Sequence, residues 1–276
     1  MGKVTCEICP HKCSIKEGSI GFCNARGNRN GVITSINYGY VTSIALDPIE
    51  KKPFYNFNPG TKILSVGSFG CNLRCSHCQN YGISMGNKEE VPYEYVEPEK
   101  LVEYGVNTKR MGNIGIAYTY NEPLIGYEFV KDCALLAKEK GLKNCIVTNG
   151  YINEKPLYDI VEYIDAFNID LKAFTDSFYK KIKGDLETVK ETIRIASKYS
   201  HVEVTTLIIP GENDSEEEIK ELSSWLGGIN PHIPLHISRF FPRYKMLDKG
   251  PTPVEKIYTL ADIARENLKY VYEGNC

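Results

Sequence analysis

The chain has 276 residues, and its 33 basic and 35 acidic side chains leave a formal net charge of −2. With 42% hydrophobic and 25% charged residues it has the composition of a folded globular protein, which excludes a disordered or fibrous chain. The balanced charge gives no reason to expect nucleic acid or an acidic membrane as a partner. No apolar run reaches the ~18–20 residues of a membrane span, and the first residues contain no apolar core of a secretion signal, so we expect a cytoplasmic protein.

Four cysteines lie close together near the N-terminus: Cys6, Cys9, Cys13 and Cys23. In a long chain without an export signal, closely spaced cysteines favour metal binding over disulfides. Four thiolates form a closed shell that suits structural zinc, or a second iron–sulfur cluster with no open iron, and we favour zinc. The surrounding stretch has few periodic apolar residues, and one or two strands are expected over 31–57. We interpret residues 1–60 as a small N-terminal metal-binding lobe.

Residues 61–276 alternate short β-branched runs with segments of helical periodicity. The runs are KILSVGSFG, NIGIAYTY, NCIVTNG, AFNIDLKAF, HVEVTTLIIPG and PLHISRFFP. Helices are expected over 124–139, 157–164, 186–200, 216–226 and 254–268. Six strands with intervening helices imply an α/β fold with a parallel sheet and right-handed crossovers. Polar and glycine residues follow the runs, so we expect a functional pocket at the carboxyl ends of the strands.

A second group of cysteines follows the first of these runs. Cys71, Cys75 and Cys78 form a CxxxCxxC pattern. Three thiolates on one loop leave one iron of a four-iron cluster free to bind another ligand. On its own, the pattern also fits a zinc site that takes a distant fourth ligand, or buried cysteines without metal.

At these residues the chain resembles the radical S-adenosylmethionine (SAM) superfamily, whose signature is CxxxCxxC with an aromatic residue just before the last cysteine; His77 stands at that position. The resemblance implies a partial (β/α)6 barrel over residues 61–276, a [4Fe-4S] cluster on the three cysteines, and SAM bound to the free iron. It also implies an electron donor such as ferredoxin or flavodoxin. The reduced cluster would cleave SAM to a 5′-deoxyadenosyl radical, which abstracts a hydrogen atom from a substrate.

The ends of the later runs resemble the pyruvate formate-lyase activating enzyme branch of that superfamily. Glu122 matches a Gly-Gly-Glu-Pro motif in which Asn121 replaces a glycine, and the other matching residues are Thr148 and Asn149 in TNG, Asp170 in DLK, and His236. By this resemblance they contact SAM together with His77, and Glu122 is the anionic acceptor for the SAM amino group. From the residues alone, Glu122 is equally a helix N-terminal acid, TNG a turn, Asp170 a helix cap and His236 a core residue.

Two further residues, Val147 and Asn168, bear on which polar groups would surround SAM. Val147 replaces an aspartate that helps to hold a monovalent cation in the activating enzyme, which argues against a cation here. Asn168, two residues before Asp170, adds a candidate polar ligand.

Longer strings, including DPIEKKPFYNFNPG, AYTYNEP and VEVTTLIIPGENDS, resemble the radical SAM proteins of the AmmeMemoRadiSam group over essentially the whole chain. This resemblance implies cofactor and chemistry but no particular substrate. We expect hydrogen abstraction from a peptide or small molecule. One alternative is a glycyl-radical activase, and another is a non-catalytic iron–sulfur or zinc module for electron transfer or assembly. Candidate residues at the mouth of the barrel, which either recognise an acidic substrate or form a solvated surface, are Lys51, Lys52, Arg239, Arg243, Tyr244 and Lys245.

Overall fold

The six apolar runs all form strands of one sheet in the computed structural model, which describes residues 2–276. The strands are β7 (Lys62–Gly67), β9 (Asn113–Tyr118), β10 (Lys143–Thr148), β11 (Ala166–Asp170), β12 (His201–Ile208) and β13 (Leu235–Arg239). They lie side by side in chain order, and each neighbouring pair is parallel. The predicted parallel sheet with crossover connections is therefore confirmed.

Two further strands extend this sheet to eight. The short strand β14 (Val271–Gly274) pairs in parallel with β13, and β6 (Ser43–Pro48) pairs antiparallel with β7. The order is β14-β13-β12-β11-β10-β9-β7-β6, so β14 and β6 are its two edges and the barrel is not closed. The fold is the expected partial barrel. The structure differs from the expected boundary at residue 60 in one respect, because β6 lies inside 1–60 but belongs to the main sheet.

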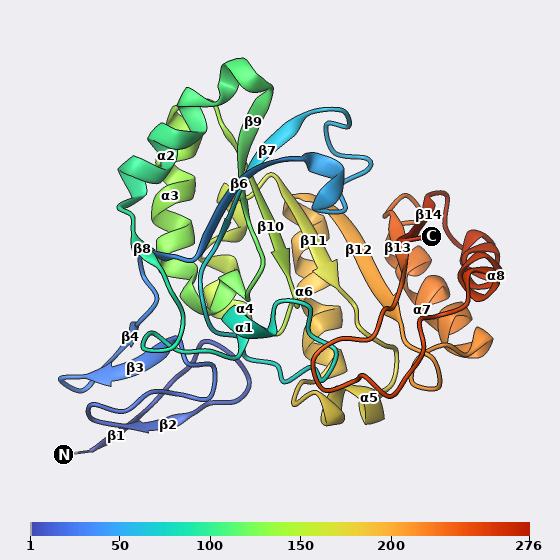
Figure 1. Ribbon diagram of the computed structural model, residues 1–276, viewed down its shortest axis with the longest axis horizontal. Helices are drawn as coiled ribbons and strands as arrows, with labels where there is room; N and C mark the ends of the chain where they lie inside the picture. Colours follow the sequence, from blue (N-terminus) through green and yellow to red (C-terminus); the bar gives the residue numbers. More distant parts are fainter. Residues whose placement is uncertain (1) are drawn as a thin grey trace.

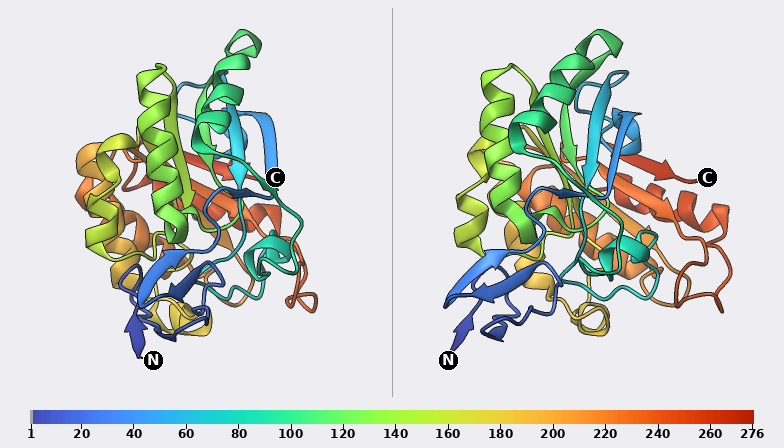
Figure 2. Two further views of the ribbon diagram at one scale, coloured as in Figure 1. Left: turned by 90° about the vertical axis from the view of Figure 1, so that its left-hand side faces the viewer. Right: turned by 60° about the vertical axis from the view of Figure 1, so that its left-hand side comes forward.

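The longer helices connect successive strands and cover one face of the sheet, whereas the short α1 (Tyr81–Ser84) borders the cavity on the other face (Figures 1 and 2). The other α-helices are α2 (Pro98–Asn107), α3 (Tyr127–Glu139), α4 (Glu154–Tyr158), α5 (Asp176–Lys181), α6 (Leu186–Tyr199), α7 (Glu216–Ile229) and α8 (Val254–Arg265). Short 3-10 helices are η1 (Ile49–Lys51), η2 (Lys109–Met111), η3 (Pro123–Gly126) and η4 (Val161–Tyr163). The helix expected over 157–164 is split into α4 and η4, and α1, α2 and α5 were not expected. Within residues 2–276, no helix has the length and apolar character that crossing a bilayer requires.

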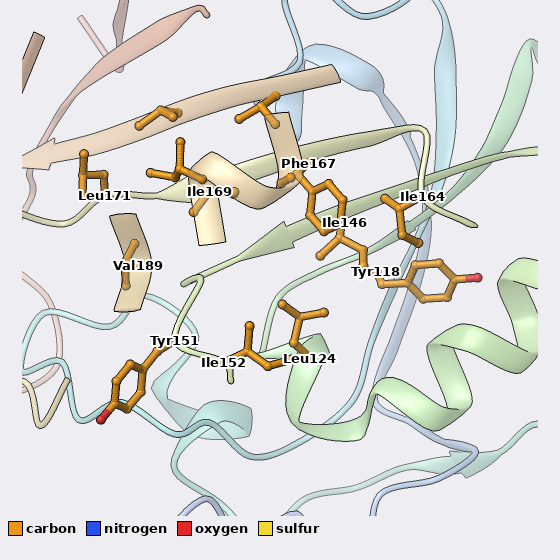
Figure 3. Packing of buried hydrophobic residues seen from close by; sticks show 14 of the residues in the cluster. Tyr118, Leu124, Ile146, Tyr151, Ile152, Ile164, Phe167, Ile169, Leu171 and Val189 are labelled. Atoms are coloured by element: carbon orange, nitrogen blue, oxygen red, sulfur yellow. The ribbon is translucent and has the colours of Figure 1, made fainter. Parts of the chain in front are cut away.

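The core lies between the sheet and these helices. Side chains of neighbouring strands, such as Ile146 of β10 and Phe167 and Ile169 of β11, are fully buried and point into one cluster (Figure 3). Tyr118 at the end of β9 and Leu124 in η3 join the same cluster. Each such buried side chain contributes about 1.5–3 kcal/mol by leaving water. This core holds the carboxyl ends of the strands in fixed positions.

The N-terminal lobe lies at the end of the molecule to which β10 and β11 point (Figure 1). Its strands are β1 (Lys3–Thr5) with β2 (Ser14–Lys16) and β3 (Arg26–Arg29) with β4 (Val32–Ser35), while β5 (Tyr40–Val41) pairs with β8 (Glu94–Tyr95). Arg26 is buried and makes a bidentate ion pair with Glu128 of α3, at 2.8 and 2.7 Å. Asn153 donates from its backbone N–H to Ile8 and from its side chain to Glu7. The lobe is therefore fastened to the site end of the barrel.

Candidate functional site

One cavity over the inner face of the sheet is lined by every residue that the sequence placed in the barrel site. These are Cys71, Cys75, His77, Cys78, Asn121, Glu122, Thr148, Asn149, Asp170 and His236. The cavity has a volume of about 710 Å³, which is the size expected of a site for a cofactor and a small substrate. The fold thus brings together side chains from five strand ends or strands, and their individual roles stay predictions.

The three cysteines lie on the loop that follows β7, residues 68–78, which we call the cysteine loop. Gly70 has a φ of +88° there, and a Cβ at this position would lie 2.5 Å from the carbonyl oxygen of Cys23. Glycine therefore permits both the turn and the close approach of the lobe. Arg74 donates to the carbonyls of Cys71 and Leu73 at 2.7 and 2.8 Å, so it braces the turn between the cysteines.

The thiols of the cysteine loop must lose their protons before they can bind a metal. Burial raises the pKa of Cys71 well above its usual value, to which the Glu122 charge adds, and burial raises the pKa of Cys75 to about 11. Iron binding must therefore displace protons. The Asn149 side chain and the Leu73 backbone N–H point at the Cys71 sulfur, at 3.5 and 3.4 Å. Such N–H donors to sulfur tune iron–sulfur clusters.

The donor set fits a cluster held by three cysteines. Within residues 2–276, no group of three or more His, Cys, Asp or Glu side chains is arranged to hold a single metal ion directly. In an iron–sulfur cluster each thiolate binds a different iron, so the ligands surround the cluster instead of one ion. His77 is further evidence for a ligand at this place, because its buried Nδ1 has no hydrogen-bond partner among the described residues. Burial, with a smaller effect of Lys172, lowers the pKa of His77 to about 3, so this ring is neutral.

Glu122 is a buried carboxylate whose oxygens accept three hydrogen bonds. The donors are Thr148 Oγ1 at 2.7 Å, the backbone N–H of Asn149 at 2.8 Å and that of Leu124 at 3.0 Å. The last of these caps η3, so the helix-cap interpretation of Glu122 is correct, and its role toward SAM stays a prediction. A carboxylate has about four acceptor positions, which leaves one for an ammonium group. Burial raises the pKa of Glu122 to about 7 despite the hydrogen bonds, and a cation in the cavity would lower it again.

The side-chain amides of Asn121 and Asn168 are hydrogen-bonded to other residues of the chain. Asn121 accepts from the backbone N–H of Ser68 and donates to the carbonyls of Phe69 and Gly70, so it holds the start of the cysteine loop. Asn168 donates to Pro53 and accepts from Thr205. The structure gives both amides a structural use that the sequence did not reveal.

Asp170 has a cation of its own chain as its partner. Its Oδ2 lies 2.9 Å from Lys172 Nζ, two residues along the loop after β11. Burial lowers the pKa of Lys172, but Asp170 outweighs burial and raises it above its usual value. Asp170 therefore reaches the cavity as half of an ion pair. At the neighbouring strand end, Val147 brings no charge to the cavity wall.

His236 does not stand at the end of its strand, as the sequence suggested, but is the second residue of β13. Its Nε2 donates to Glu203 of β12 at 2.6 Å, and its ring packs against Tyr55 and Tyr272. The interpretation as a satisfied, buried histidine therefore describes its surroundings, although the ring still borders the cavity.

Glu203 is the most important residue that sequence reasoning missed. It is fully buried and accepts from His201, His236 and the backbone N–H groups of Tyr55 and Asn56. The last two belong to residues 52–57, which follow η1 and cross the inner face of the sheet; we call this segment the strap. In the run HVEVTT, Glu203 looks like an ordinary exposed polar residue. Only its place in an otherwise apolar strand could have indicated that it is buried.

The basic residues expected at the mouth of the barrel divide into two groups. Lys51 and Lys52 line the cavity, and Lys52 is buried with its Nζ 3.0 Å from Asp47 and 3.2 Å from the hydroxyl of Tyr120. The group outside the lining residues comprises Arg239, Arg243, Tyr244 and Lys245. Lys52 is therefore a buried, paired cation in the site, not a solvated surface charge.

The four N-terminal cysteines also meet at one place. Cys6, Cys9, Cys13 and Cys23 line a small cavity of about 10 Å³, together with His11 and Arg26. This volume is roughly that of one water molecule. Among residues 2–276, the cysteine side chains are not already arranged around one metal ion, so binding by all four cysteines would require their thiols to rotate toward one centre. The second metal site stays a prediction.

Comparison with known proteins agrees with this arrangement. Residues 65–223, more than half of the chain, match the family model of the radical SAM superfamily. An uncharacterized protein of Methanocaldococcus jannaschii is 46% identical over 277 residues, which cover 99% of this chain and 81% of that protein. The pyruvate formate-lyase-activating enzyme of Clostridium pasteurianum is 31% identical over 220 residues, covering 72% and 89% of the two chains.

Solved structures show the same fold at low sequence identity. A radical SAM methyltransferase from Sphaerobacter thermophilus has a TM-score of 0.61 at 18% identity, over 79% of this chain and 67% of that one. A domain of a pyruvate-formate lyase-activating enzyme from Bacteroides vulgatus has a TM-score of 0.52 at 17% identity, over 58% and 99%. From its sequence match, its open parallel sheet and its three-cysteine loop, the chain belongs to the radical SAM superfamily.

Proposed function

We propose that this protein is an enzyme that cleaves SAM reductively at a [4Fe-4S] cluster on Cys71, Cys75 and Cys78, and that it abstracts hydrogen from a peptide or small molecule. When bound, cluster and SAM supply a 5′-deoxyadenosyl radical and methionine. The electron comes from a donor such as ferredoxin or flavodoxin. The observation that carries the proposal is one cavity that contains three thiols, a buried carboxylate and an unpartnered histidine.

The chain's own residues would bind and orient the cofactor. Glu122 has one acceptor position left for an ammonium group, and its three hydrogen bonds fix the direction of that position. Asn149 donates to the Cys71 sulfur and fixes the rim of the cluster site. His77 offers a neutral ring nitrogen to the part of the ligand beside the cluster. A non-catalytic electron carrier would have no use for such a pocket.

Replacement of Cys71, Cys75 and Cys78 by alanine tests the proposal, because each thiolate binds a different iron of the cluster. In the anaerobically reconstituted parent, SAM should change the electron paramagnetic resonance spectrum of the reduced protein, and 5′-deoxyadenosine should form. The triple variant should lose both signals completely. Cys133→Ala is the control, because Cys133 is a buried thiol that lies in α3, outside the cavity. Cleavage of SAM by the triple variant at the parent rate would disprove the assignment.

A glycyl-radical activase is the second candidate function, and it is favoured by the 31% identity with the Clostridium pasteurianum activating enzyme. The sheet is open between β6 and β14, which leaves a side by which a polypeptide loop could enter. The test is incubation of the reduced enzyme with SAM and glycyl-radical proteins from the same source. A stable doublet signal on the partner, with one 5′-deoxyadenosine per radical, would establish activation; its absence with all partners would leave the broader proposal preferred.

We also propose membership of the AmmeMemoRadiSam group. The support is the set of strings in the strap, around Glu122 and after β12 that resemble that group. Its substrate is to be sought among peptides and small molecules of the source organism. Anaerobic incubation of the reconstituted enzyme with SAM, reductant and fractionated lysate should reveal the fraction that raises 5′-deoxyadenosine formation above the uncoupled rate.

A further inference from the structure

The cysteine loop rests directly on the lobe that carries the other four cysteines. The backbone N–H of Cys71 donates to the carbonyl oxygen of Cys23 at 3.1 Å. Gly70, next to it, leaves no room for a Cβ against the same oxygen. A proposed ligand of the barrel cluster and a cysteine of the lobe therefore share a hydrogen bond, and a displacement of Cys23 must displace Cys71.

A second contact joins the neighbouring residues. The guanidinium of Arg74 lies 3.9 Å above the ring of Phe22 and donates to the Phe22 carbonyl. The same guanidinium holds the carbonyl of Cys71. Arg74 thus clamps the cysteine loop to the residue that precedes Cys23.

Asn72 links the segment that carries the lobe cysteines to Asn149 in the barrel site. It is 1% exposed, and its carbonyl accepts from His11 Nε2 at 2.8 Å. Its side-chain oxygen accepts from Asn149 Nδ2 at 3.0 Å. Asn149 in turn points at the Cys71 sulfur. A continuous hydrogen-bonded path therefore runs from His11, which lies between Cys9 and Cys13 in the sequence, through Asn72 and Asn149 to Cys71.

The lobe also contains an unused donor beside its cysteines. Arg26 lines the same small cavity and is 2% exposed, and its Nε has no hydrogen-bond partner among residues 2–276. Its two terminal nitrogens are occupied by Glu128. A buried N–H without an acceptor is costly, and metal-bound thiolate sulfur is an acceptor that would satisfy it. This orphaned donor, independent of the cysteine spacing, points to an anionic thiolate centre in the cavity.

From these contacts we propose that Cys6, Cys9, Cys13 and Cys23 bind a soft metal centre that sets the position of the cysteine loop, with Asn72 as the positioning residue between the two sites. The centre is one zinc ion or one iron–sulfur cluster, since four thiolates complete the ligand shell of either. The role of the loop rests on the function proposed above; the metal and the mechanical coupling do not depend on it.

The metal is tested in a background that lacks the barrel cluster. After removal of Cys71, Cys75 and Cys78, the protein should retain a zinc equivalent, or iron with acid-labile sulfide, in elemental analysis. Adding Cys9→Ala should release it, and adding Cys133→Ala, which removes a buried thiol outside the four-cysteine cavity, should not. A background protein without bound zinc or iron would overturn the metal centre.

The coupling is tested by hydrogen–deuterium exchange of residues 68–78 in protein with both sites loaded and no SAM added. Cys9→Ala and Asn72→Ala should each raise exchange of this loop at least about tenfold, corresponding to ~1.4 kcal/mol of lost local stability. Asn267→Ala, which removes a donor to Ser223, is the control and should leave the loop unchanged. Unchanged exchange in Asn72→Ala would disprove the coupling even if Cys9→Ala fails to fold.

A purely structural role of Asn72 would not alter the barrel cluster itself. Because Asn72 holds the amide that faces the Cys71 sulfur, Asn72→Ala should also change the electron paramagnetic resonance spectrum of the reduced cluster, recorded without SAM, while it retains the metal of the lobe. Loss of that metal from Asn72→Ala, or a spectrum equal to that of Asn267→Ala, would count against Asn72 as the positioning residue. If the parent fails to cleave SAM but these results hold, the proposed function is wrong and the coupling stands.

Discussion

Glu203 shows how one buried charge can organise a large part of a site. Two histidine rings and two backbone N–H groups of the strap donate to its carboxylate, so each of its oxygens has two partners. Burial alone would raise the pKa of Glu203, but the hydrogen bonds from His201, His236 and the strap outweigh burial and lower it to about 2. The residue thus favours the folded state as a carboxylate.

Glu203→Gln should destabilise the protein by about 3 kcal/mol at neutral pH, because the amide cannot accept four hydrogen bonds and the lowered pKa is lost. The pKa falls from 4.5 in the unfolded chain to about 2 when folded, so this stability is complete above pH 4.5 and disappears as the pH falls toward 2. Denaturant unfolding of parent and variant across this range should give curves that converge at low pH. A difference that stays constant with pH would refute the explanation.

At the scale of a loop and its neighbours, Gly70 is the position that most restricts substitution. A side chain there meets both an unfavourable φ of +88° and the Cys23 carbonyl at 2.5 Å. The same φ range occurs at Gly112, where +90° is combined with open space around the missing Cβ. Comparing substitutions at these two glycines therefore separates the free-energy cost of the positive φ from the cost of the clash with the Cys23 carbonyl.

Gly70→Ala should lower the free energy of unfolding by ~2 kcal/mol more than Gly112→Ala, because only the first displaces the lobe. It should also reduce the amount of cluster that the reconstituted protein retains, measured as iron and sulfide per chain. Equal effects of the two substitutions on stability and on iron content would show that the Cys23 contact does not matter.

The elements differ in how far their sequence predicts them. The six inner strands were predictable because each is an apolar run of five to eight residues between turn signals. The edge strand β14 has only four residues, VYEG, and α2 begins at Pro98 with a weakly apolar sequence. The pairing of β6 with β7 could not be predicted, because the strands of the lobe and those of the sheet show the same alternation of apolar and polar residues.

The candidate site was predictable for the same reason, since its cysteines and strand ends follow the runs directly. What could not be predicted was the use of each side chain. Asn121 and His236 look like ligands in the sequence, but the Asn121 amide is bound to the cysteine loop and the His236 Nε2 to Glu203. Glu203 and Asn72 matter only because segments far away in the chain meet them.

Across the whole molecule, the two halves of the chain meet at the cysteine loop. The rings of Tyr81 and Tyr244 are stacked, with centroids 4.5 Å apart and planes at 14°. The backbone N–H of Lys245 donates to the carbonyl of Ser76 at 2.9 Å. The loop after β13 therefore contacts the cysteine loop at Ser76, between Cys75 and Cys78, and packs against α1, the helix that follows the cysteine loop.

Tyr244→Ala should make the cluster more sensitive to air. A stacked aromatic pair contributes about 0.5–1.5 kcal/mol, so without it this contact should open several times more often, up to about tenfold. The measurement is the half-life of the visible cluster absorbance after exposure to air, with Tyr258→Ala as control because Tyr258 is exposed on α8. An unchanged half-life would mean that this loop does not shield the cluster.

The strap also has a consequence for the order in which the protein is made. The hydroxyl of Tyr272 donates to the Asn56 side chain at 2.6 Å, across 216 residues of chain. The strap leaves the ribosome well before its partners on β12 and β14. It can therefore complete these contacts on the inner face of the sheet only after β14 has been synthesised. A chain shortened before β14 should accordingly hold the strap, which forms one wall of the cavity, less firmly.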